Sequence, residues 1–346
     1  MADRPRALEP TRVNDRAEQA SSWRGRRVFV TGATGLLGSH LVEALLGRGA
    51  EVTCLVRDWE PRARAVEEGW IDRVSQVRGE LEDLALLERA VNEHEIEAVF
   101  HLGAQTIVGT AARSPISTFE SNVRGTWNVL EACRRAGKLV SRVVVASSDK
   151  AYGESASLPY TEDTPLRGRF PYDASKAAAD LIAASYFHTY ALPVAIARCG
   201  NLFGPGDVNW NRLVPGTIRS ALRGESPVIR SDGTHVRDWL FVDDAVDGYL
   251  ALAERAPESG VAGEAFQFGG ERPLSVLELV GWILRLAGRE GLQPTILATA
   301  SNEIPRQQLD CSKARSRLGW KPSRGLEAGL AETIAWHAQR ARSQAP

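Results

Sequence analysis

The chain has 346 residues, of which 43% are hydrophobic and 25% are charged, and its formal net charge is -1 at pH 7. This length suits one large domain or two smaller ones that share a core, and the composition is ordinary for a globular protein. A net charge near zero gives no reason to expect nucleic acid or an anionic membrane as a partner.

Residues 1–24 are polar and charged and lack the apolar core of a signal peptide, so we expect a flexible N-terminal arm. No apolar run approaches the length of a membrane span. No group of His, Cys, Asp and Glu has the spacing of metal ligands, and we expect no metal. The cysteines form no CxxC pair, which favours buried thiols in a reducing cytoplasm. They are Cys54, Cys133, Cys199 and Cys311.

Short apolar strands alternate with helix-like stretches from residue 26 to about residue 198. The expected strands are 28–31, 51–56, 74–77, 98–102, 142–147 and 193–198, and the expected helices are 35–48, 84–92, 117–136 and 172–190. This alternation predicts a parallel sheet with helices on both faces. With right-handed crossovers, the fold class is α/β, a doubly wound Rossmann sheet.

A glycine loop joins the first strand to the first helix. Gly32 permits a tight turn, Gly35 lets the backbone approach a pyrophosphate, and Gly38 allows close packing of helix on sheet. The free N–H groups of the helix N-terminus favour a phosphate there. We therefore predict a dinucleotide site that includes Thr34, Leu36 and Leu37.

The second strand is followed by Arg57 and Asp58, which bear on the choice of cofactor. A carboxylate at this point accepts a hydrogen bond from the ribose 2′-hydroxyl of NAD, whereas an Arg accommodates the 2′-phosphate of NADP. Arg57 stands nearer to the usual position, so the sequence favours NADP and leaves NAD open.

The regular alternation of strands and helices ends at the turn 204–207, and irregularly spaced helical and strand segments follow. We expect a smaller α+β lobe that binds the substrate. The predicted division gives residues 25–200 and about 234–256 to the Rossmann domain, and residues 201–233 and 257–340 to the substrate-binding lobe.

Tyr172 and Lys176 stand four residues apart on an expected helix and so share one face. An ammonium beside a phenol favours the tyrosinate, which would make Tyr172 usable as a base. Ser148 ends the fifth strand, at the edge where a parallel sheet meets its ligand, and is placed to hydrogen-bond a substrate hydroxyl.

Five motifs resemble those of the extended short-chain dehydrogenases in order and spacing, over roughly residues 26–340. They are TGATGLLG at 31–38, HLGAQ at 101–105, SSDKAYG at 147–153, YDASK at 172–176 and RCGNLFGPG at 198–206. The resemblance implies a tightly bound NAD(P) that is regenerated in each turnover and a nucleotide diphosphate sugar as substrate. Further cofactor contacts that it implies are Glu80, Leu81, Leu102 and Ala104.

Asp149 and Lys150 directly follow Ser148, and such an acid–base pair is similar to that of the nucleotide-sugar 4,6-dehydratases. Lys in the second place resembles CDP-glucose 4,6-dehydratase, although Ser148 stands where these enzymes often have Thr. The resemblance implies that Lys150 removes the C5 proton and Asp149 protonates the C6 hydroxyl. A 4-epimerase, an NADPH-dependent keto-sugar reductase and an inactive cofactor-binding regulator remain alternatives.

The same family implies a set of substrate-binding residues and a mode of assembly. Arg237 and Arg306 match positions that hold the diphosphate, and Arg suits this role because it binds phosphate oxygens in pairs. The nucleotide base is not indicated. The helices 117–136 and 172–190 match those that commonly pair in a homodimer. The other expected substrate contacts are Gln105, Asn201, Arg212, Leu213 and Val214.

Overall fold

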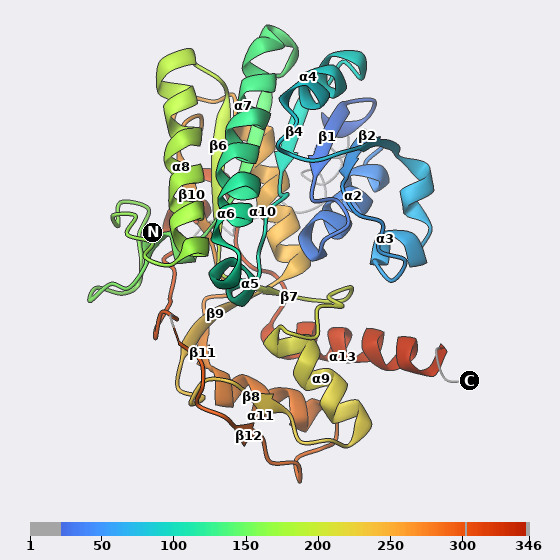
Figure 1. The fold of residues 1–346 in the computed structure, drawn as a ribbon, viewed down its shortest axis with the longest axis vertical. Helices are drawn as coiled ribbons and strands as arrows, with labels where there is room; N and C mark the ends of the chain where they lie inside the picture. Colours follow the sequence, from blue (N-terminus) through green and yellow to red (C-terminus); the bar gives the residue numbers. More distant parts are fainter. Residues whose placement is uncertain (1–21, 302, 344–346) are drawn as a thin grey trace, which may run out of the picture.

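The computed structural model describes residues 22–301 and 303–343, and its larger domain is built on a seven-stranded parallel sheet (Figure 1). The strand order is β3-β2-β1-β4-β5-β6-β10. This arrangement confirms the predicted α/β fold. The strands are β1 (Arg27–Thr31), β2 (Glu51–Val56), β3 (Ser75–Arg78), β4 (Ala98–His101), β5 (Arg142–Ser148), β6 (Val194–Cys199) and β10 (Ala265–Phe268).

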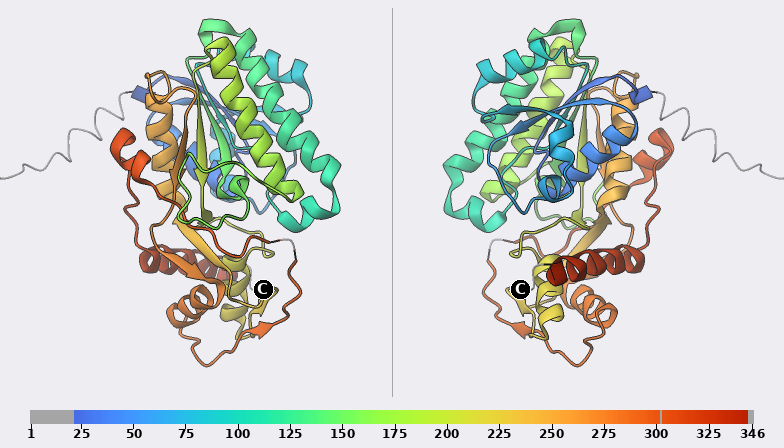
Figure 2. Two further views of the ribbon diagram at one scale, coloured as in Figure 1. Left: turned by 90° about the vertical axis from the view of Figure 1, so that its left-hand side faces the viewer. Right: turned by 90° about the vertical axis from the view of Figure 1, so that its right-hand side faces the viewer.

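Helices cover both faces of the sheet, because successive strand residues point to opposite sides. In β1, Val28 and Val30 join one buried cluster and Phe29 joins the other. Figure 2 shows the two helical layers edge-on. One layer holds α4 (Leu84–Glu93), α7 (Gly125–Arg135) and α8 (Pro171–Tyr190), and the other holds α2 (Leu36–Gly47), α10 (Val242–Arg255) and α12 (Ser312–Leu318).

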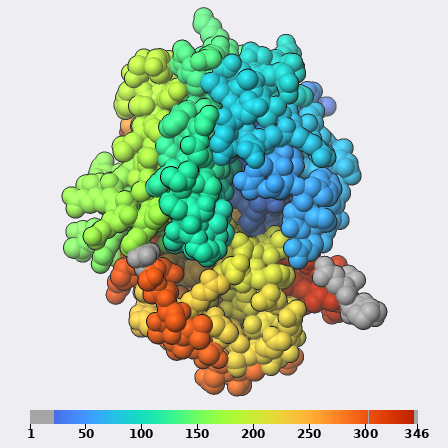
Figure 3. Space-filling view, in the orientation of Figure 1, coloured from blue at the N-terminus to red at the C-terminus, as the bar shows by residue number. Residues whose placement is uncertain are grey.

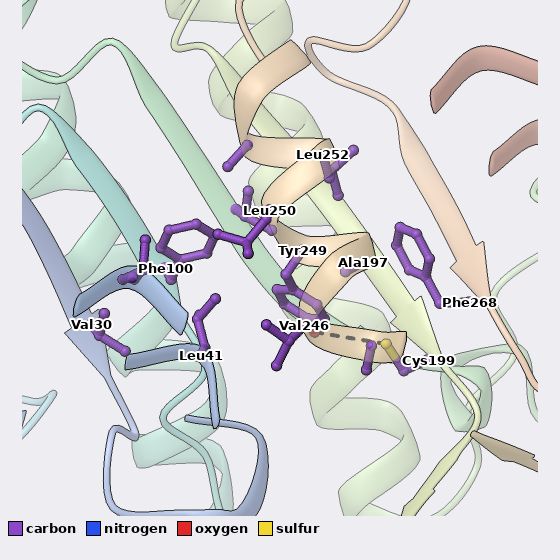
Figure 4. Close-up of a cluster of buried hydrophobic side chains, with 14 of the residues drawn as sticks. Val30, Leu41, Phe100, Ala197, Cys199, Val246, Tyr249, Leu250, Leu252 and Phe268 are labelled. Carbon is purple, nitrogen blue, oxygen red and sulfur yellow. Dashed lines mark hydrogen bonds between the residues drawn. The ribbon is translucent and has the colours of Figure 1, made fainter. Parts of the chain in front are cut away.

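The cluster under α10 links this helix to the middle of the sheet (Figure 4). The Cys199 thiol donates a hydrogen bond to the hydroxyl of Tyr249 over 3.9 Å. Trp23 is also fully buried, and its Nε1 donates to Glu254 of α10 over 2.7 Å. Trp23 is therefore packed into the domain, although it falls in the predicted arm 1–24. Residues 1–21 of that arm lie outside the described residues.

The second lobe sits beyond the carboxyl ends of the sheet strands (Figure 1) and has a buried cluster of its own. It differs from the predicted division in two places: β10 belongs to the large sheet, and β9 pairs with β7 and β11 in a three-stranded sheet. Its strands are β7 (Asn201–Phe203), β8 (Val228–Ile229), β9 (Val236–Phe241), β11 (Pro273–Ser275) and β12 (Thr295–Ile296). Its helices are α9 (Leu213–Arg223), α11 (Val276–Leu286) and α13 (Leu326–Ser343).

The helix predicted over 117–136 is interrupted. A π-helical turn at Glu120–Arg124 separates α6 (Pro115–Phe119) from α7. The buried Asn122 in this turn donates to the carbonyl of Gln105 over 3.0 Å and to Ser175 Oγ over 2.9 Å. The short helices α3 (Arg64–Glu67) and α5 (Val108–Arg113) complete the domain. Within the described ranges, no helix is long and apolar enough to cross a membrane.

Candidate active site

A cavity of about 880 Å³ lies between the carboxyl edge of the large sheet and the second lobe. Figure 3 shows the recess between the blue and teal surface of the sheet domain and the yellow surface of the lobe. The cavity reaches from the glycine loop to α9 and β9. This is the edge at which ligands bind in open α/β sheets.

The glycine loop fits a dinucleotide at one end of the cavity. A Cβ on Gly38 would collide with the carbonyl oxygen of Gly32, and one on Gly32 would lie 2.7 Å from the amide nitrogen of Gly103. Gly35 lines the cavity, as Gly32 and Gly38 do, and is the N-cap of α2, with no side-chain cap. The first N–H groups of α2 therefore remain available for a phosphate. Thr34, Leu36 and Leu37 also line this end.

Thr31 and His101 fix the neighbouring loop after β4. Thr31 Oγ1 accepts hydrogen bonds from the amides of Leu102, at 3.2 Å, and Gly103, at 3.0 Å. His101 lies between Thr31 and Thr126, and burial lowers its pKa to about 3, so the ring is neutral. Thr31, which is held by His101, therefore positions the loop that carries the expected contacts Leu102 and Ala104, both of which line the cavity.

Arg57 and Asp58 both line the cavity and bind each other: Arg57 Nε donates to Asp58 Oδ2 over 2.6 Å. Both side chains are exposed. The guanidinium that favoured NADP is thus already paired with the carboxylate that would suit NAD.

Ser148, Tyr172 and Lys176 converge on the middle of the cavity, from β5 and α8. Lys176 Nζ donates to the carbonyl of Ala146 over 2.8 Å, which ties the first turns of α8 to β5. Burial lowers the pKa of Lys176 to about 8, against the opposing effect of Asp180. The predicted lowering of the Tyr172 pKa is absent, because burial raises it to about 12 and the hydrogen bond with Ser148 opposes that only in part.

Asp149 and Lys150 line the same cavity from the short turn after β5. Burial raises the pKa of Asp149, although Lys150 and Arg237 lower it. Burial also lowers the pKa of Lys150, with Arg237 acting in the same direction and Asp149 in the opposite one. A raised carboxyl pKa and a lowered amine pKa are what an acid and a base require near neutral pH. Asp149 Oδ1 accepts from Ser148 Oγ over 3.1 Å, and Asp149 Oδ2 is buried without a hydrogen-bond partner among the described residues.

The far end of the cavity is built by the second lobe. Arg212 caps α9 and crosses to the sheet domain, where its guanidinium donates to Thr106 Oγ1 over 2.9 Å. Arg237 is buried and donates to Glu303 over 3.1 Å. Asn201, Leu213 and Val214, which were predicted as substrate contacts, also line the cavity.

Three expected site residues do not line the cavity. Glu80 is exposed in the turn before α4, where Leu81 and Glu82 face the cavity in its place. Gln105 turns back to its own loop, and its Oε1 accepts from the amide of Ile107 over 3.0 Å. Arg306 is exposed, and its backbone bridges to Val236. Family spacing places these residues along the chain but carries no information on the direction of each side chain.

Several residues at the site were not predicted from the sequence. Glu303 lines the cavity beside Arg237, and Gln307 accepts from Lys150 Nζ over 3.1 Å. Trp210 lines the cavity from the second lobe, and the Arg219 guanidinium lies 5.1 Å from the centre of its ring. None of them stands in a motif, because they come from loops whose positions depend on the packing of the lobe. The described residues hold no group of His, Cys, Asp and Glu that could bind a metal.

Comparison with known proteins identifies the family. Residues 28–269 match the family model described as the NAD dependent epimerase/dehydratase family. The chain belongs to this family. Membership confirms the prediction from the motifs and establishes NAD(P) as the cofactor class.

Relatives within the epimerase/dehydratase family cover nearly the whole chain. The dTDP-glucose 4,6-dehydratase of Xanthomonas campestris pv. campestris is 32% identical over 89% of this chain and 92% of its own. The CDP-glucose 4,6-dehydratase of Salmonella typhimurium is 32% identical over 91% of each chain. Among solved structures, the dTDP-glucose 4,6-dehydratase DesIV of Streptomyces venezuelae, with NAD bound, is 33% identical with a TM-score of 0.83 over 92% of this chain and 98% of its own. The UDP-glucose 4-epimerase of Thermotoga maritima, with UDP-glucose, is 28% identical with a TM-score of 0.83 over 91% and 99%.

Proposed function

We propose that the protein is a nucleotide-sugar 4,6-dehydratase, which converts a nucleotide diphosphate hexose into its 4-keto-6-deoxy derivative. The observation that carries the proposal is the pair Asp149 and Lys150, which lines one cavity with Ser148 and Tyr172. The pKa values of the pair move in the directions that acid–base catalysis needs. The 4,6-dehydratase relatives support the same activity.

The chemistry divides among these side chains. NAD(P), held by the glycine loop, Tyr172 and Lys176, would supply a reversible hydride acceptor, so that C4 of the sugar can be oxidised and C6 reduced. Tyr172 removes the proton of the 4-hydroxyl, and Ser148 hydrogen-bonds that oxygen. The resulting ketone acidifies the C5 proton, which Lys150 removes as its neutral amine. Asp149, in its protonated form, gives a proton to the departing C6 hydroxyl, which leaves as water. When hydride has been added at C6, the Lys150 ammonium, which exchanges with solvent, returns a proton to C5, so the sugar undergoes no net redox change.

The Tyr172 pKa fits this scheme only when positive charge lies close to the phenol. Burial holds that pKa at about 12 in the protein alone. Arg212 lowers it in the protein alone, and the Lys176 ammonium, one helical turn further along α8, would add to this effect below a pH of about 8, where it keeps its proton. We assign Lys176 to this role and to holding the cofactor ribose.

We propose NAD as the bound cofactor, in place of the NADP that Arg57 favoured. The Asp58 carboxylate already neutralises Arg57, and an acidic group beside a 2′-phosphate would repel it. DesIV was crystallised with NAD. The diphosphate of the substrate would lie between Arg212 and Arg237, since both guanidinium groups line the lobe end of the cavity.

We further propose a homodimer and a cytoplasmic location. Large apolar side chains are exposed on α6, α7 and α8, the helices that the family commonly pairs. Ile116 is 73% exposed and Leu181 is 61% exposed; Phe119, Trp127 and Tyr190 lie on the same helices. All four cysteines are free and buried, which fits a reducing compartment.

A 4-epimerase is the second candidate, because the Thermotoga maritima epimerase has the same fold. An epimerase needs the C4 oxidation but has no use for an acid and a base at C5 and C6. The test is incubation with CDP-, dTDP-, UDP- and GDP-hexoses, followed by mass analysis. A product lighter by one water supports the dehydratase, whereas a product of unchanged mass with inverted C4 supports the epimerase.

A further inference from the structure

The Lys150 amine is held by an uncharged partner that comes from the second lobe. Lys150 Nζ donates to Gln307 Oε1 over 3.1 Å. Gln307 is fully buried, and its Nε2 has no hydrogen-bond partner among the described residues. A buried amide donor without a partner lowers stability, so stability alone does not explain a Gln at this position.

The backbone around Gln307 is fixed on both sides. The Gln307 amide donates to the carbonyl of Val236 over 3.0 Å, and the Val236 amide donates to Pro305 over 2.9 Å. Tyr160 donates to the carbonyl of Gln308 over 2.8 Å. Gln307 therefore presents its side chain from a rigid segment between β9 and the loop at Tyr160.

We propose that Gln307 is a positioning residue: it aims the Lys150 amine at the reacting carbon of the substrate and does so without a charge that would keep the amine protonated. The inference rests on the proposed dehydration, since only that reaction uses Lys150 as a base. A carboxylate in the same place would aim the amine equally well but would stabilise its ammonium form.

The charges around Lys150 come from four elements, and their balance is consistent with this role. Asp149 precedes it in the turn after β5, Asp173 lies on α8, Arg237 on β9 and Glu303 in the loop before Gln307. Burial lowers the Lys150 pKa, Arg237 acts with it, and the three carboxyl groups oppose it. A further carboxylate at hydrogen-bond distance would raise the Lys150 pKa and so favour its ammonium form.

The test measures deuterium incorporation at C5 of the sugar as a function of pH, for the purified wild-type enzyme and for Gln307→Glu. The wild-type rate should rise as the pH passes the Lys150 pKa. In Gln307→Glu the pH at which the rate rises should be higher by about one unit or more. Above that pH the exchange rate should return to the wild-type value. The neighbouring Gln308→Glu adds the same charge one residue away and should leave the pH of the rise unchanged.

Gln307→Met removes the acceptor while keeping the volume. It should lower C5 exchange at every pH by about tenfold, the effect of one lost hydrogen bond to a charged or reacting group. The rate of cofactor reduction, which reports C4 oxidation, should remain near the wild-type rate. If Gln307→Glu does not fold, this variant tests whether Gln307 positions the Lys150 amine.

The results separate the inference from the proposed function. If the wild-type enzyme neither loses water nor exchanges C5, the dehydratase itself is wrong. If the wild type does both, an unchanged pH of the rise in Gln307→Glu or wild-type exchange in Gln307→Met overturns only the role of Gln307. Equal losses of C4 oxidation and C5 exchange would make Gln307 merely structural, which also overturns it.

Discussion

Arg57 Nε donates a 2.6 Å hydrogen bond to the carboxylate of Asp58, directly after β2 and at the rim of the cavity. Because both side chains are exposed, the pair contributes little to stability. The pair bears on the choice between NAD and NADP, because these two residues would contact the adenosine ribose.

Replacement of Asp58 should change the cofactor preference. In Asp58→Ala the ribose loses its acceptor and Arg57 is freed, so the ratio of NAD to NADP affinity should fall by about tenfold or more. Calorimetric titration with each cofactor measures the ratio, and Arg57→Ala, which keeps the carboxylate, serves as the control. Tighter binding of NADP than NAD by the unaltered protein, lost in Arg57→Ala, would reverse the assignment.

Loss of the Tyr172 hydroxyl should stop the first step. Tyr172→Phe should retain the cofactor and lose turnover by about a hundredfold or more, the usual effect of removing a general base. Tyr186→Phe removes a hydroxyl from the same helix outside the cavity, and it should keep its activity. Near wild-type turnover in Tyr172→Phe would remove the tyrosine from the mechanism.

Sequence reasoning succeeded where the local pattern determines structure. The glycine loop, the alternation of strands and helices and the site residues at strand ends follow from short-range geometry, and Ser148, Asp149 and Lys150 line the cavity as expected. The rise of the Tyr172 pKa was not predictable in this way, because it comes from burial, which is a property of the whole fold.

Long-range packing explains the other differences. The π-helical turn in the predicted helix 117–136 contains Asn122, which bonds to Gln105 in the loop after β4 and to Ser175 on α8, and these bonds form only when the three segments pack together. Gln307 reaches Lys150 across 157 positions of sequence. No periodicity or motif carries such information.

A buried ion pair should hold α8 against β6. Arg198 binds Asp180 through Nε and one terminal nitrogen, each at 2.8 Å, and both side chains are buried. Arg198→Met should reduce the free energy of unfolding by about 3–5 kcal/mol, because it leaves the Asp180 charge unpaired. Urea denaturation measures the loss. Arg124→Met removes an exposed partner of Glu120 and should change stability by at most about 1 kcal/mol.

The homodimer should depend on the exposed apolar side chains of α8. Leu181→Glu places a charge in the proposed contact and should shift the protein to a monomer at micromolar concentration, as measured by light scattering. Val228→Glu, at an exposed apolar position of the second lobe, is the matched control and should remain a dimer. A monomer in the unaltered protein would contradict the proposed assembly.

Lys150→Ala separates the two halves of the reaction. Oxidation at C4 does not involve this amine, so reduced cofactor should still form when the nucleotide sugar is added. Exchange at C5 and loss of water should fall together, by about a hundredfold or more, because both require the base. Water loss at the wild-type rate would assign the base to another residue.

The central claim is elimination across C5 and C6, and the reaction run in deuterated water tests it most directly. Removal of the C5 proton by Lys150 and its later replacement from solvent should give a product that carries deuterium at C5 and is lighter by the loss of one water. Nuclear magnetic resonance locates the deuterium and mass spectrometry gives the mass. A product with inverted C4, no deuterium at C5 and no loss of water would contradict the dehydratase.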